Sequence, residues 1–451
     1  MNNNADFSIG SPAKNILKLA VPMTIAQLIN LLYNMIDRIY IGRIPTTGTL
    51  ALTGLGLCFP IIMIVTAFAN LFSFGGAPLF SMERGRENDE EAQKIMGNSF
   101  LMMIIFGVSL TVIGLLFQKP ILYLFGASDA TYPFARDYIT IYLLGNIFVM
   151  TSLGMNSFIN AQGFAKKGML TVMLGAFTNL ILDPIFIFYF GMGVKGAAIA
   201  TIISQLLSSL WVLKFLTGKK AIIKLTKESM HLRGSRVKRI IDLGMSGFIM
   251  SVTNSIVQII CNATLQIYGG DLYVGVMTIL NSIREIFTMP VSGITDGATP
   301  VMSYNYGAKN FAKLKRAIKF MSVICIAYTF LAWITIIAFP DVFIKIFNHD
   351  PKLIAKSIPA IEIYFFGFFM MALQFAGQRV FVSLGKSGYA VFFSIFRKVI
   401  IVTPLTILLP KFFSLGVNGV FLAEPISNFI GGLACFITML VVVLPEINND
   451  D

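Results

Sequence analysis

The sequence predicts an all-α membrane protein with twelve transmembrane helices in two six-helix bundles related by a pseudo-twofold axis. Of the 451 residues, 56% are hydrophobic and only 13% are charged, whereas soluble domains carry roughly 25% charged residues. Apolar segments of about 20 residues, the length that crosses a bilayer as a helix, recur along the whole chain. The second half also repeats the pattern of the first, which predicts the two bundles.

Apolar runs bounded by charged residues, Gly or Pro define the twelve candidate spans. The first six cover residues 15–41, 50–76, 95–117, 134–162, 168–190 and 194–216. The second six cover residues 239–268, 272–303, 317–339, 357–384, 388–410 and 417–444. We therefore predict an N-terminal lobe at residues 1–216, a basic cytoplasmic linker at 217–238 and a C-terminal lobe at 239–451.

The distribution of Lys and Arg predicts the topology. An even number of spans places both termini on one side, and the loops predicted on that side hold most of the basic residues. Since cytoplasmic loops collect Lys and Arg, we expect a cell-membrane protein with both termini in the cytoplasm. The same rule accounts for the net charge of +13, so no nucleic-acid partner is expected. The basic stretch at 217–238 is interpreted as a solvated loop beside anionic lipid.

The two halves share local motifs at a nearly constant offset. Three residues recur 222 positions later, in the pairs Pro78 and Pro300, Gly85 and Gly307, and Asn88 and Asn310. The segment "GVKGAAIAT" at 193–201 matches "GVNGVFLAE" at 416–424. An even number of helices separates equivalent points, so the copies have the same orientation, as in transporters built from parallel repeats. Channels are more naturally built from several identical subunits, so the duplication within one chain favours a transporter.

Polar stripes run along four helices of the first half. Asn30, Asn34 and Asp37 share one helical face, as do Asn179 and Asp183 in the fifth span. The sixth span adds Thr201 and Gln205, and the fourth adds Ser152, Asn156 and Asn160. A charge at the bilayer centre costs at least about 2.5–3.5 kcal/mol, so these stripes should face inward around a cavity. Interhelical hydrogen bonding is the alternative for the amides and hydroxyls, and pairing with Arg38 is the alternative for the carboxylates.

The two carboxylates predict a site for a coupling ion. Like charges in a poorly solvated pocket repel, which favours binding of a proton. Together with the oxygens of Asn179 and Thr201, Asp37 and Asp183 also form the oxygen-rich set that a hard cation such as Na⁺ prefers. The sequence leaves H⁺ and Na⁺ open. Pro184 frees a backbone carbonyl in the preceding turn and permits a kink, so a charge change here could bias helix shape.

The second half carries amides where the first carries acids. Gln258 lies in the seventh span and Gln374 in the tenth, and Thr403-Pro404 stands where Asp183-Pro184 stands in the first half. Arg284 and Glu285 are interpreted as a local charge cluster. The candidate substrate-cavity residues of the whole chain are Asn30, Asn34, Asn156, Asn160, Gln205, Gln258 and Gln374.

Catalytic chemistry is not expected. The four cysteines lie in apolar segments without metal-ligand spacing, and His231 and His349 are far apart in polar loops. No nucleophile–base pair stands out, and no cofactor is expected beyond the coupling ion.

Four segments together resemble the multidrug and toxic compound extrusion (MATE) transporters. They are "LAVPMTIAQLINLLYNMIDRIYIGR", "NAQGFAKKGM", "NLILDPIFIFYFGMGVKGAAIATIISQ" and "SYNYGAKN". The resemblance covers nearly the whole chain and implies drug export coupled to inward H⁺ or Na⁺. It points to the DinF/MepA-like branch, in which the cation site lies in the N-terminal lobe, at positions matching Asp37, Asn179, Asp183 and Thr201. The NorM-like branch also uses C-terminal carboxylates, and Gln258 and Gln374 depart from that pattern.

We therefore expect a cation-coupled multidrug antiporter that exports amphipathic, cationic compounds by alternating access. The expected partners are drugs or toxic metabolites and the lipid bilayer, and the expected state is a monomer. The alternative is a related flippase for lipids or lipid-linked oligosaccharides, which should show a more cationic cavity. The basic candidates for such a cavity are Arg38, Arg284, Arg379, Arg397 and Lys398.

Overall fold

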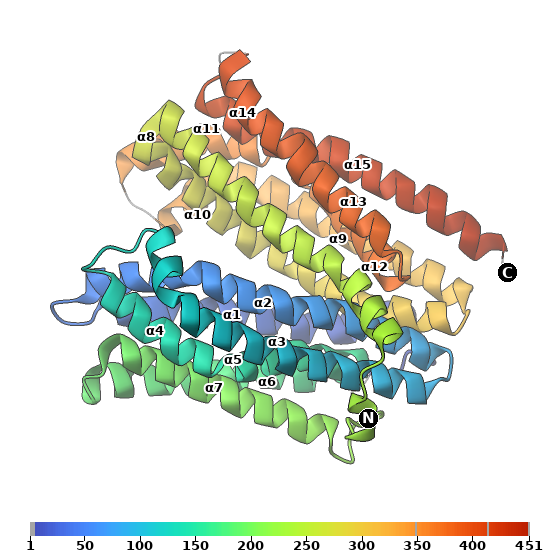
Figure 1. Cartoon of the computed structure of the whole chain (residues 1–451). Helices are drawn as coiled ribbons and strands as arrows, with labels where there is room; N and C mark the ends of the chain where they lie inside the picture. Colours follow the sequence, from blue (N-terminus) through green and yellow to red (C-terminus); the bar gives the residue numbers. More distant parts are fainter. Residues whose placement is uncertain (1–4, 348–349, 413–414, 450–451) are drawn as a thin grey trace. The chain divides into compact units, whose positions relative to one another are not determined.

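The computed structural model describes residues 5–347, 350–412 and 415–449, and this part of the chain is helical with connecting loops (Figure 1). His349 lies outside the described residues. The chain divides into two compact units. The first comprises Met1–Ala5 and Val21–Gly244, and the second comprises Asp6–Ala20 and Met245–Asp451. The start of the first helix thus groups with the second unit.

Helices follow one another with short connections, except for the longer segment between α7 and α8. In the first half they are α1 (Pro12–Gly42), α2 (Gly48–Gly85), α3 (Asp89–Leu124), α4 (Tyr132–Leu144), α5 (Asn146–Ala161), α6 (Ala165–Pro184), η1 (Ile185–Tyr189), α7 (Gly193–Leu216) and η2 (Glu228–Met230). In the second half they are α8 (Gly234–Gly307), α9 (Phe311–Ala338), α10 (Pro340–Phe347), α11 (Pro351–Tyr364), α12 (Met370–Ser383), α13 (Ser387–Ile395), η3 (Phe396–Val402), α14 (Thr403–Phe412) and α15 (Val417–Asn449). η1 and η3 are π-helical.

These elements account for the twelve predicted spans. Within the described ranges, nine helices or helix runs are long and apolar enough to cross a membrane. One of them, α8, breaks at Gly270, whose φ of 66° and ψ of −167° are not helical, and so supplies two spans. The pair α4 and α5, bent by 57°, forms another. α11 and α12, on either side of residues 365–369, occupy the predicted tenth span. The predicted fold class is confirmed.

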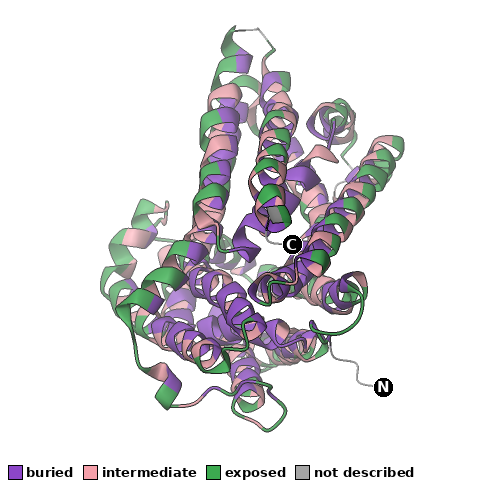
Figure 2. Cartoon of the chain, turned by 90° about the vertical axis from the view of Figure 1, so that its right-hand side faces the viewer, coloured by how far each residue is buried: buried purple, intermediate pink, exposed green. Residues whose placement is uncertain are grey.

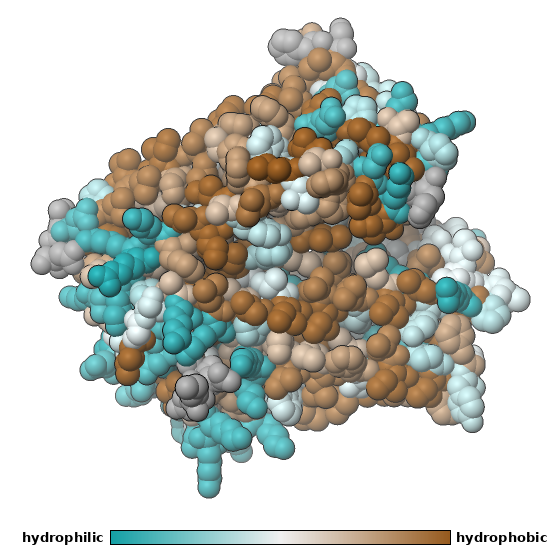
Figure 3. All heavy atoms as spheres, turned by 180° about the vertical axis from the view of Figure 1, so that it is seen from behind, coloured by the Kyte–Doolittle hydropathy of each residue, from teal (hydrophilic) through white to brown (hydrophobic). Residues whose placement is uncertain are grey.

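The surface of the helices suits a bilayer. Hydrophobic residues cover most of the face seen in Figure 3, and large apolar side chains such as Leu116 and Ile259 are exposed at 72% and 68%. Many of the helices carry buried residues along one side and exposed residues along another (Figure 2), whereas α12 has no exposed residue. Because lipid tails are as apolar as these side chains, the helices are held together mainly by close packing and polar contacts.

Close packing in the first unit depends on a glycine contact between α2 and the start of α8. A Cβ atom on Gly75 would lie 1.9 Å from the carbonyl oxygen of Ile240, and one on Gly244 would lie 1.8 Å from that of Leu71. No side chain fits at such distances, so the two backbones lie in direct contact. This contact fastens the end of the connecting segment to the first unit.

The sequence repeat is visible in local backbone geometry. Asn88 and Asn310 cap α3 and α9, each accepting a hydrogen bond at 3.1 Å from the backbone N–H three residues later. The residues before them, Glu87 and Lys309, both have positive φ values, of 60° and 54°. Equivalent positions therefore adopt the same helix start in both halves, as the 222-residue offset predicts.

The basic connecting segment is ordered, and the expectation of a solvated loop is wrong for part of it. Ser229 is buried, and its carbonyl accepts a hydrogen bond from Asn98 at 3.1 Å. Gln162 accepts from two backbone N–H groups of the same segment, at 2.8 and 3.0 Å. Arg236 forms a bidentate ion pair with Glu91, at 2.9 and 2.7 Å. The segment thus packs against the N-terminal part of α3 and the C-terminal end of α5.

The second unit has one contiguous apolar core. Leu280, Ile336, Phe365 and Phe421 are fully buried within it, and they come from α8, α9, the α11–α12 connection and α15. An unpaired charge among these closely packed apolar side chains would be costly.

Candidate functional site

The first unit brings together the four residues predicted to bind the coupling ion. Asp37 of α1 and Asp183 of α6 are 8% and 1% exposed, and their carboxylates face each other closely enough to be bridged by one proton. The amide nitrogen of Asn179 donates to Asp183 at 3.2 Å and to the Thr201 hydroxyl at 3.4 Å. Asn179 and Thr201 are also buried. The result is a compact buried cluster of oxygen atoms from three helices.

The backbone beside Asp183 is irregular. α6 ends at Pro184, and the π-helical turn η1 follows immediately. Proline lacks the N–H that would continue the hydrogen-bond ladder, and π-helical turns are frequent at functional sites. The sequence predicted a kink at this proline, and the structure has a change of helix type. Asp183 therefore occupies the last turn of regular helix before the irregularity.

The sequence analysis missed two tyrosines that lie beside the carboxylates and a third that packs against them. Tyr33 lies one turn before Asp37 on the same face of α1 and interacts electrostatically with both acids. Tyr138 bonds to Thr201, and its ring stacks with that of Tyr142 at 6.3 Å. The i, i+4 spacing of Tyr33 to Asp37 was the signal that could have identified the first of them. The other two are placed by tertiary packing of α4.

Each acid retains an oxygen without a donor. Asp37 Oδ1 and Asp183 Oδ2 are buried and accept no hydrogen bond from any described residue. Arg38 is exposed and places its guanidinium 4.5 Å above the Phe59 ring, so it does not close off the pair as a structural partner. Buried carboxylate oxygens without donors are costly unless a proton or cation satisfies them. The arrangement is suited to binding one.

The other predicted polar residues of the first half mostly make interhelical or local bonds. Asn30 is exposed, and the Asn34 amide donates to its carbonyl at 2.7 Å. The Asn156 amide donates to the carbonyl of Gly168 on α6 at 3.2 Å, and Asn160 faces the same glycine. Gln205 accepts a hydrogen bond from the Ser152 hydroxyl at 2.5 Å. The alternative explanation, hydrogen bonding between helices, applies to Asn156 and Gln205.

The amides predicted in the second half are separate features. Gln258 is exposed on α8. Gln374 is buried on α12 and donates weakly to the Phe393 carbonyl at 3.5 Å. The described contacts do not join these two amides into one site.

Two charge pairs in the second unit were also not anticipated. Arg284 pairs with Glu424 of α15 at 3.2 Å, so the interpretation of Arg284 and Glu285 as a local cluster missed its main partner. Asp296 pairs with Arg379 at 2.5 Å. Both contacts join residues far apart in the sequence and on different helices, so helical spacing could not reveal them.

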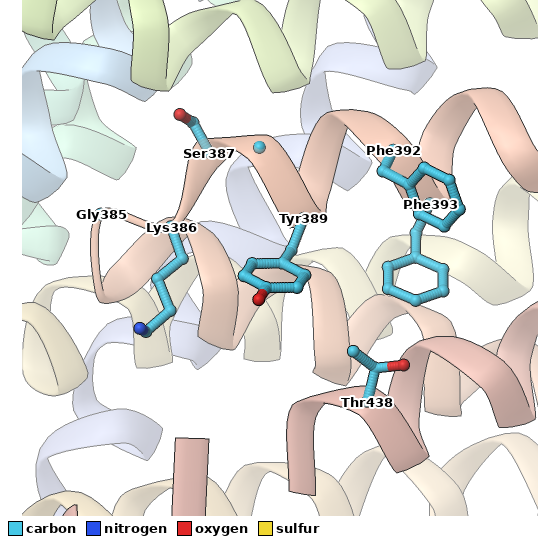
Figure 4. Close-up of a pocket in the computed structure, with 8 residues that line it drawn as sticks. Gly385, Lys386, Ser387, Tyr389, Phe392, Phe393 and Thr438 are labelled. Carbon is cyan, nitrogen blue, oxygen red and sulfur yellow. The ribbon is translucent and has the colours of Figure 1, made fainter. Parts of the chain in front are cut away.

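A cavity of about 560 Å³ opens in the second unit near the start of α13 (Figure 4). Tyr389, Phe393 and Thr438 line it, together with Lys386. Lys386 forms an ion pair with Glu446 at 2.6 Å. The lining is mainly apolar, with three aromatic residues, and it does not include the predicted site residues.

Comparison with known proteins settles the family. The MatE family model matches residues 22–185 and 248–408, one match in each half. The protein belongs to the MATE family. The multidrug export protein MepA of Staphylococcus haemolyticus is 24% identical over 438 residues, covering 96% of this chain and 94% of the relative. MepA of Staphylococcus aureus strain MRSA252 is 22% identical over 433 residues, covering 96% and 93%.

Solved MATE structures share the whole fold. A MOP superfamily transporter from Pyrococcus furiosus matches with a TM-score of 0.91 at 24% identity, covering 99% of this chain and 98% of that one. A MATE crystallised with MaL6 matches with a TM-score of 0.92 at 23% identity, covering 100% and 99%. The resemblance found in the sequence and the two-lobe architecture are thus confirmed, and the protein is a membrane transporter. The roles of individual site residues stay predictions.

Proposed function

We propose that this MATE protein is a multidrug efflux antiporter that exchanges amphipathic, cationic compounds for H⁺ or Na⁺ across the cell membrane, with both termini in the cytoplasm. The multidrug export function given for the MepA relatives supports the substrate class. The buried pair of Asp37 and Asp183 supports ion coupling, and it is the observation that carries the proposal.

The proposed coupling follows from charge. With both acids ionised, the first unit holds two buried like charges that repel each other and attract a cationic compound. Entry of H⁺ or Na⁺ cancels part of this charge, which removes both the repulsion and the attraction. A cationic compound and the coupling ion thus compete for the same negative charge, and exchange of one for the other is the expected outcome.

Asn179 and Thr201 suit either H⁺ or Na⁺ as the coupling ion. Asn179 presents its amide nitrogen to Asp183 and Thr201, and that donor stabilises a carboxylate pair that shares a proton. Turned over, the same amide would present its oxygen to Na⁺. Thr201 would still offer an oxygen to either ion.

The π-helical turn beside Asp183 offers a way to couple a change of charge at the acid pair to a change of helix shape. A π-helical turn adjoining Asp183 leaves backbone groups that can change partners at low cost. Relief of the repulsion between Asp37 and Asp183 would let α1 move toward α6. We propose that this movement narrows the polar site as the ion enters.

The test is transport in proteoliposomes with an imposed pH or Na⁺ gradient and a panel of fluorescent cationic dyes. We expect gradient-driven dye movement that Asp37→Asn and Asp183→Asn each abolish and Asn179→Ala weakens less, because it removes a donor and not a charge. The matched control is Asp137→Asn, which alters a carboxylate paired with Arg136 and Lys195. Dye movement that survives both site substitutions would refute coupling through this pair.

A further inference from the structure

The second unit contains a buried cluster of three basic side chains around one acid. Glu424 of α15 accepts hydrogen bonds from Arg397 and from Lys398, the latter at 3.4 Å, and forms an ion pair with Arg284 at 3.2 Å. The Arg397 and Lys398 side chains are 3% and 7% exposed, Glu424 is 8% exposed, and Arg284 at 23% forms the more open edge. All four residues lie in membrane-spanning helices of the same unit.

The cluster carries more positive than negative charge. Three basic groups and one carboxylate give a formal net charge of +2. Arginine stays protonated in proteins, so even a neutral Lys398 would leave two guanidinium groups facing one carboxylate, a net charge of +1. Glu285, the acid next in sequence to Arg284, is exposed. Glu424 makes the largest Coulombic contribution at Arg284, Arg397 and Lys398.

The other partners in the cluster are neutral. Arg397 donates to the side-chain oxygens of Asn428 and Ser427. Arg284 donates to the Tyr364 hydroxyl at 2.9 Å. These bonds orient the guanidinium groups without neutralising them. A purely structural ion pair needs one cation for one acid, and a surplus of buried positive charge is expensive in a dry interior.

The backbone is shaped so that two adjacent residues point at the same place. Arg397 and Lys398 both lie in the π-helical segment η3, and both reach Glu424. The Thr403 hydroxyl donates to the Lys398 carbonyl at 3.0 Å and so supplies a hydrogen-bond donor to a backbone acceptor of the irregular turn. Guanidinium groups present planar sets of donors that match carboxylate and phosphate oxygens, and a lysine adds a mobile donor.

We propose that this cluster, formed by Arg284, Arg397, Lys398 and Glu424, is a binding site for an oxyanion, the carboxylate or phosphate group of a small molecule that approaches from the Arg284 edge. The bound oxyanion supplies the negative charge that Glu424 alone does not. The site goes beyond the proposed cation-coupled efflux and does not depend on it, because all of its residues belong to the second unit.

The test is equilibrium binding to the purified full-length protein in nanodiscs, with sodium benzoate and inorganic phosphate as probes and sodium chloride as the comparison. Titration calorimetry and thermal unfolding give two readouts. We expect saturable binding of benzoate or phosphate, and the tighter of the two identifies the preferred oxyanion. Binding of chloride as tight as that of either probe would overturn the assignment to an oxyanion.

Variants locate the site. Arg284→Gln and Lys398→Gln should each weaken binding by about tenfold or more, the effect of losing a hydrogen bond to a charged group. Glu424→Gln should tighten binding, because it removes the competing carboxylate. Lys411→Gln changes an exposed lysine on α14 of the same span; it is the matched control and should leave affinity unchanged.

Absence of saturable binding, or equal affinity in Arg284→Gln and Lys411→Gln, would overturn the proposal. Arg284 is the most exposed member, so its variant is the one expected to fold normally.

Discussion

Replacing Asp183 with asparagine should stabilise the folded protein at pH 10. The substitution keeps the size of a side chain that is 1% exposed and removes one of two facing carboxylates. Two unit charges about 4 Å apart repel by about 4 kcal/mol at an effective dielectric constant of 20. That figure is the upper limit of the gain, reached when both acids are ionised in the native protein.

The gain should depend on pH in a defined direction. At pH 5 a proton shared by Asp37 and Asp183 already removes the repulsion and replaces it with a hydrogen bond, so the substitution should change stability little. As the pH rises, the wild type loses that proton and that stability, while the amide introduced by Asp183→Asn does not titrate. The difference between variant and wild type should therefore grow from pH 5 to pH 10.

Thermal unfolding of the purified protein in nanodiscs at both pH values measures this difference. Asp37→Asn should behave like Asp183→Asn, because either change leaves a single carboxylate. Asp137→Asn is the control, since Asp137 is partly exposed and paired with two basic groups, and its loss should cost no more than about 1 kcal/mol. Equal destabilisation by Asp183→Asn at both pH values would show that Asp183 is a structural hydrogen-bond acceptor, and the repulsion argument would fail.

Two further predictions concern packing of the first unit. Gly75→Ala should destabilise the protein by about 3 kcal/mol or more, the upper range for overpacking, because its Cβ would meet a backbone oxygen that cannot turn away. Gly56→Ala on the same helix is the control for thermal unfolding, because a Cβ there has nothing within 4 Å. Arg236→Gln should cost about 2–3 kcal/mol by leaving Glu91 without its bidentate partner, whereas Lys238→Gln, at an exposed position, should not lower the unfolding temperature.

Most of the fold could be predicted from the sequence, because membrane spans need long apolar segments whatever their packing. The bend between α4 and α5 could not, since residues 134–162 contain no proline to mark it and Gly145, where the helix breaks, packs closely against Ile202 of α7. The docking of the connecting segment was also missed. Its basic composition indicates solvent exposure, but its burial is set by individual contacts such as the one from Asn98 to Ser229.

The candidate site, like the fold, could be predicted from the sequence only in part. Asp37 and Asp183 could be identified because an acid in an apolar span is costly and rarely placed without a function. The contact between them, and the tyrosines around them, required the tertiary structure. The basic cluster was harder to recognise, because Arg284 and Glu424 lie on different helices and each could have been satisfied locally. The sequence analysis named Arg284, Arg397 and Lys398 as candidates for a cationic cavity, but it could not show that they meet at Glu424.

The two halves share a backbone irregularity rather than a charge. η1 follows Pro184 in the fifth span, and η3 precedes Pro404 in the equivalent span of the second half. The first adjoins a buried acid pair, and the second contains Arg397 and Lys398. A π-helical turn exposes backbone groups and redirects side chains, which any ion site in a helix bundle needs, while the sign of the ion depends on a few side chains. Because each polar cluster is enclosed by helices of its own unit, substitutions could reverse the charge of one without affecting the other. Opposite polarity in the two halves is then a natural outcome of duplication, and each cluster can be altered and measured separately.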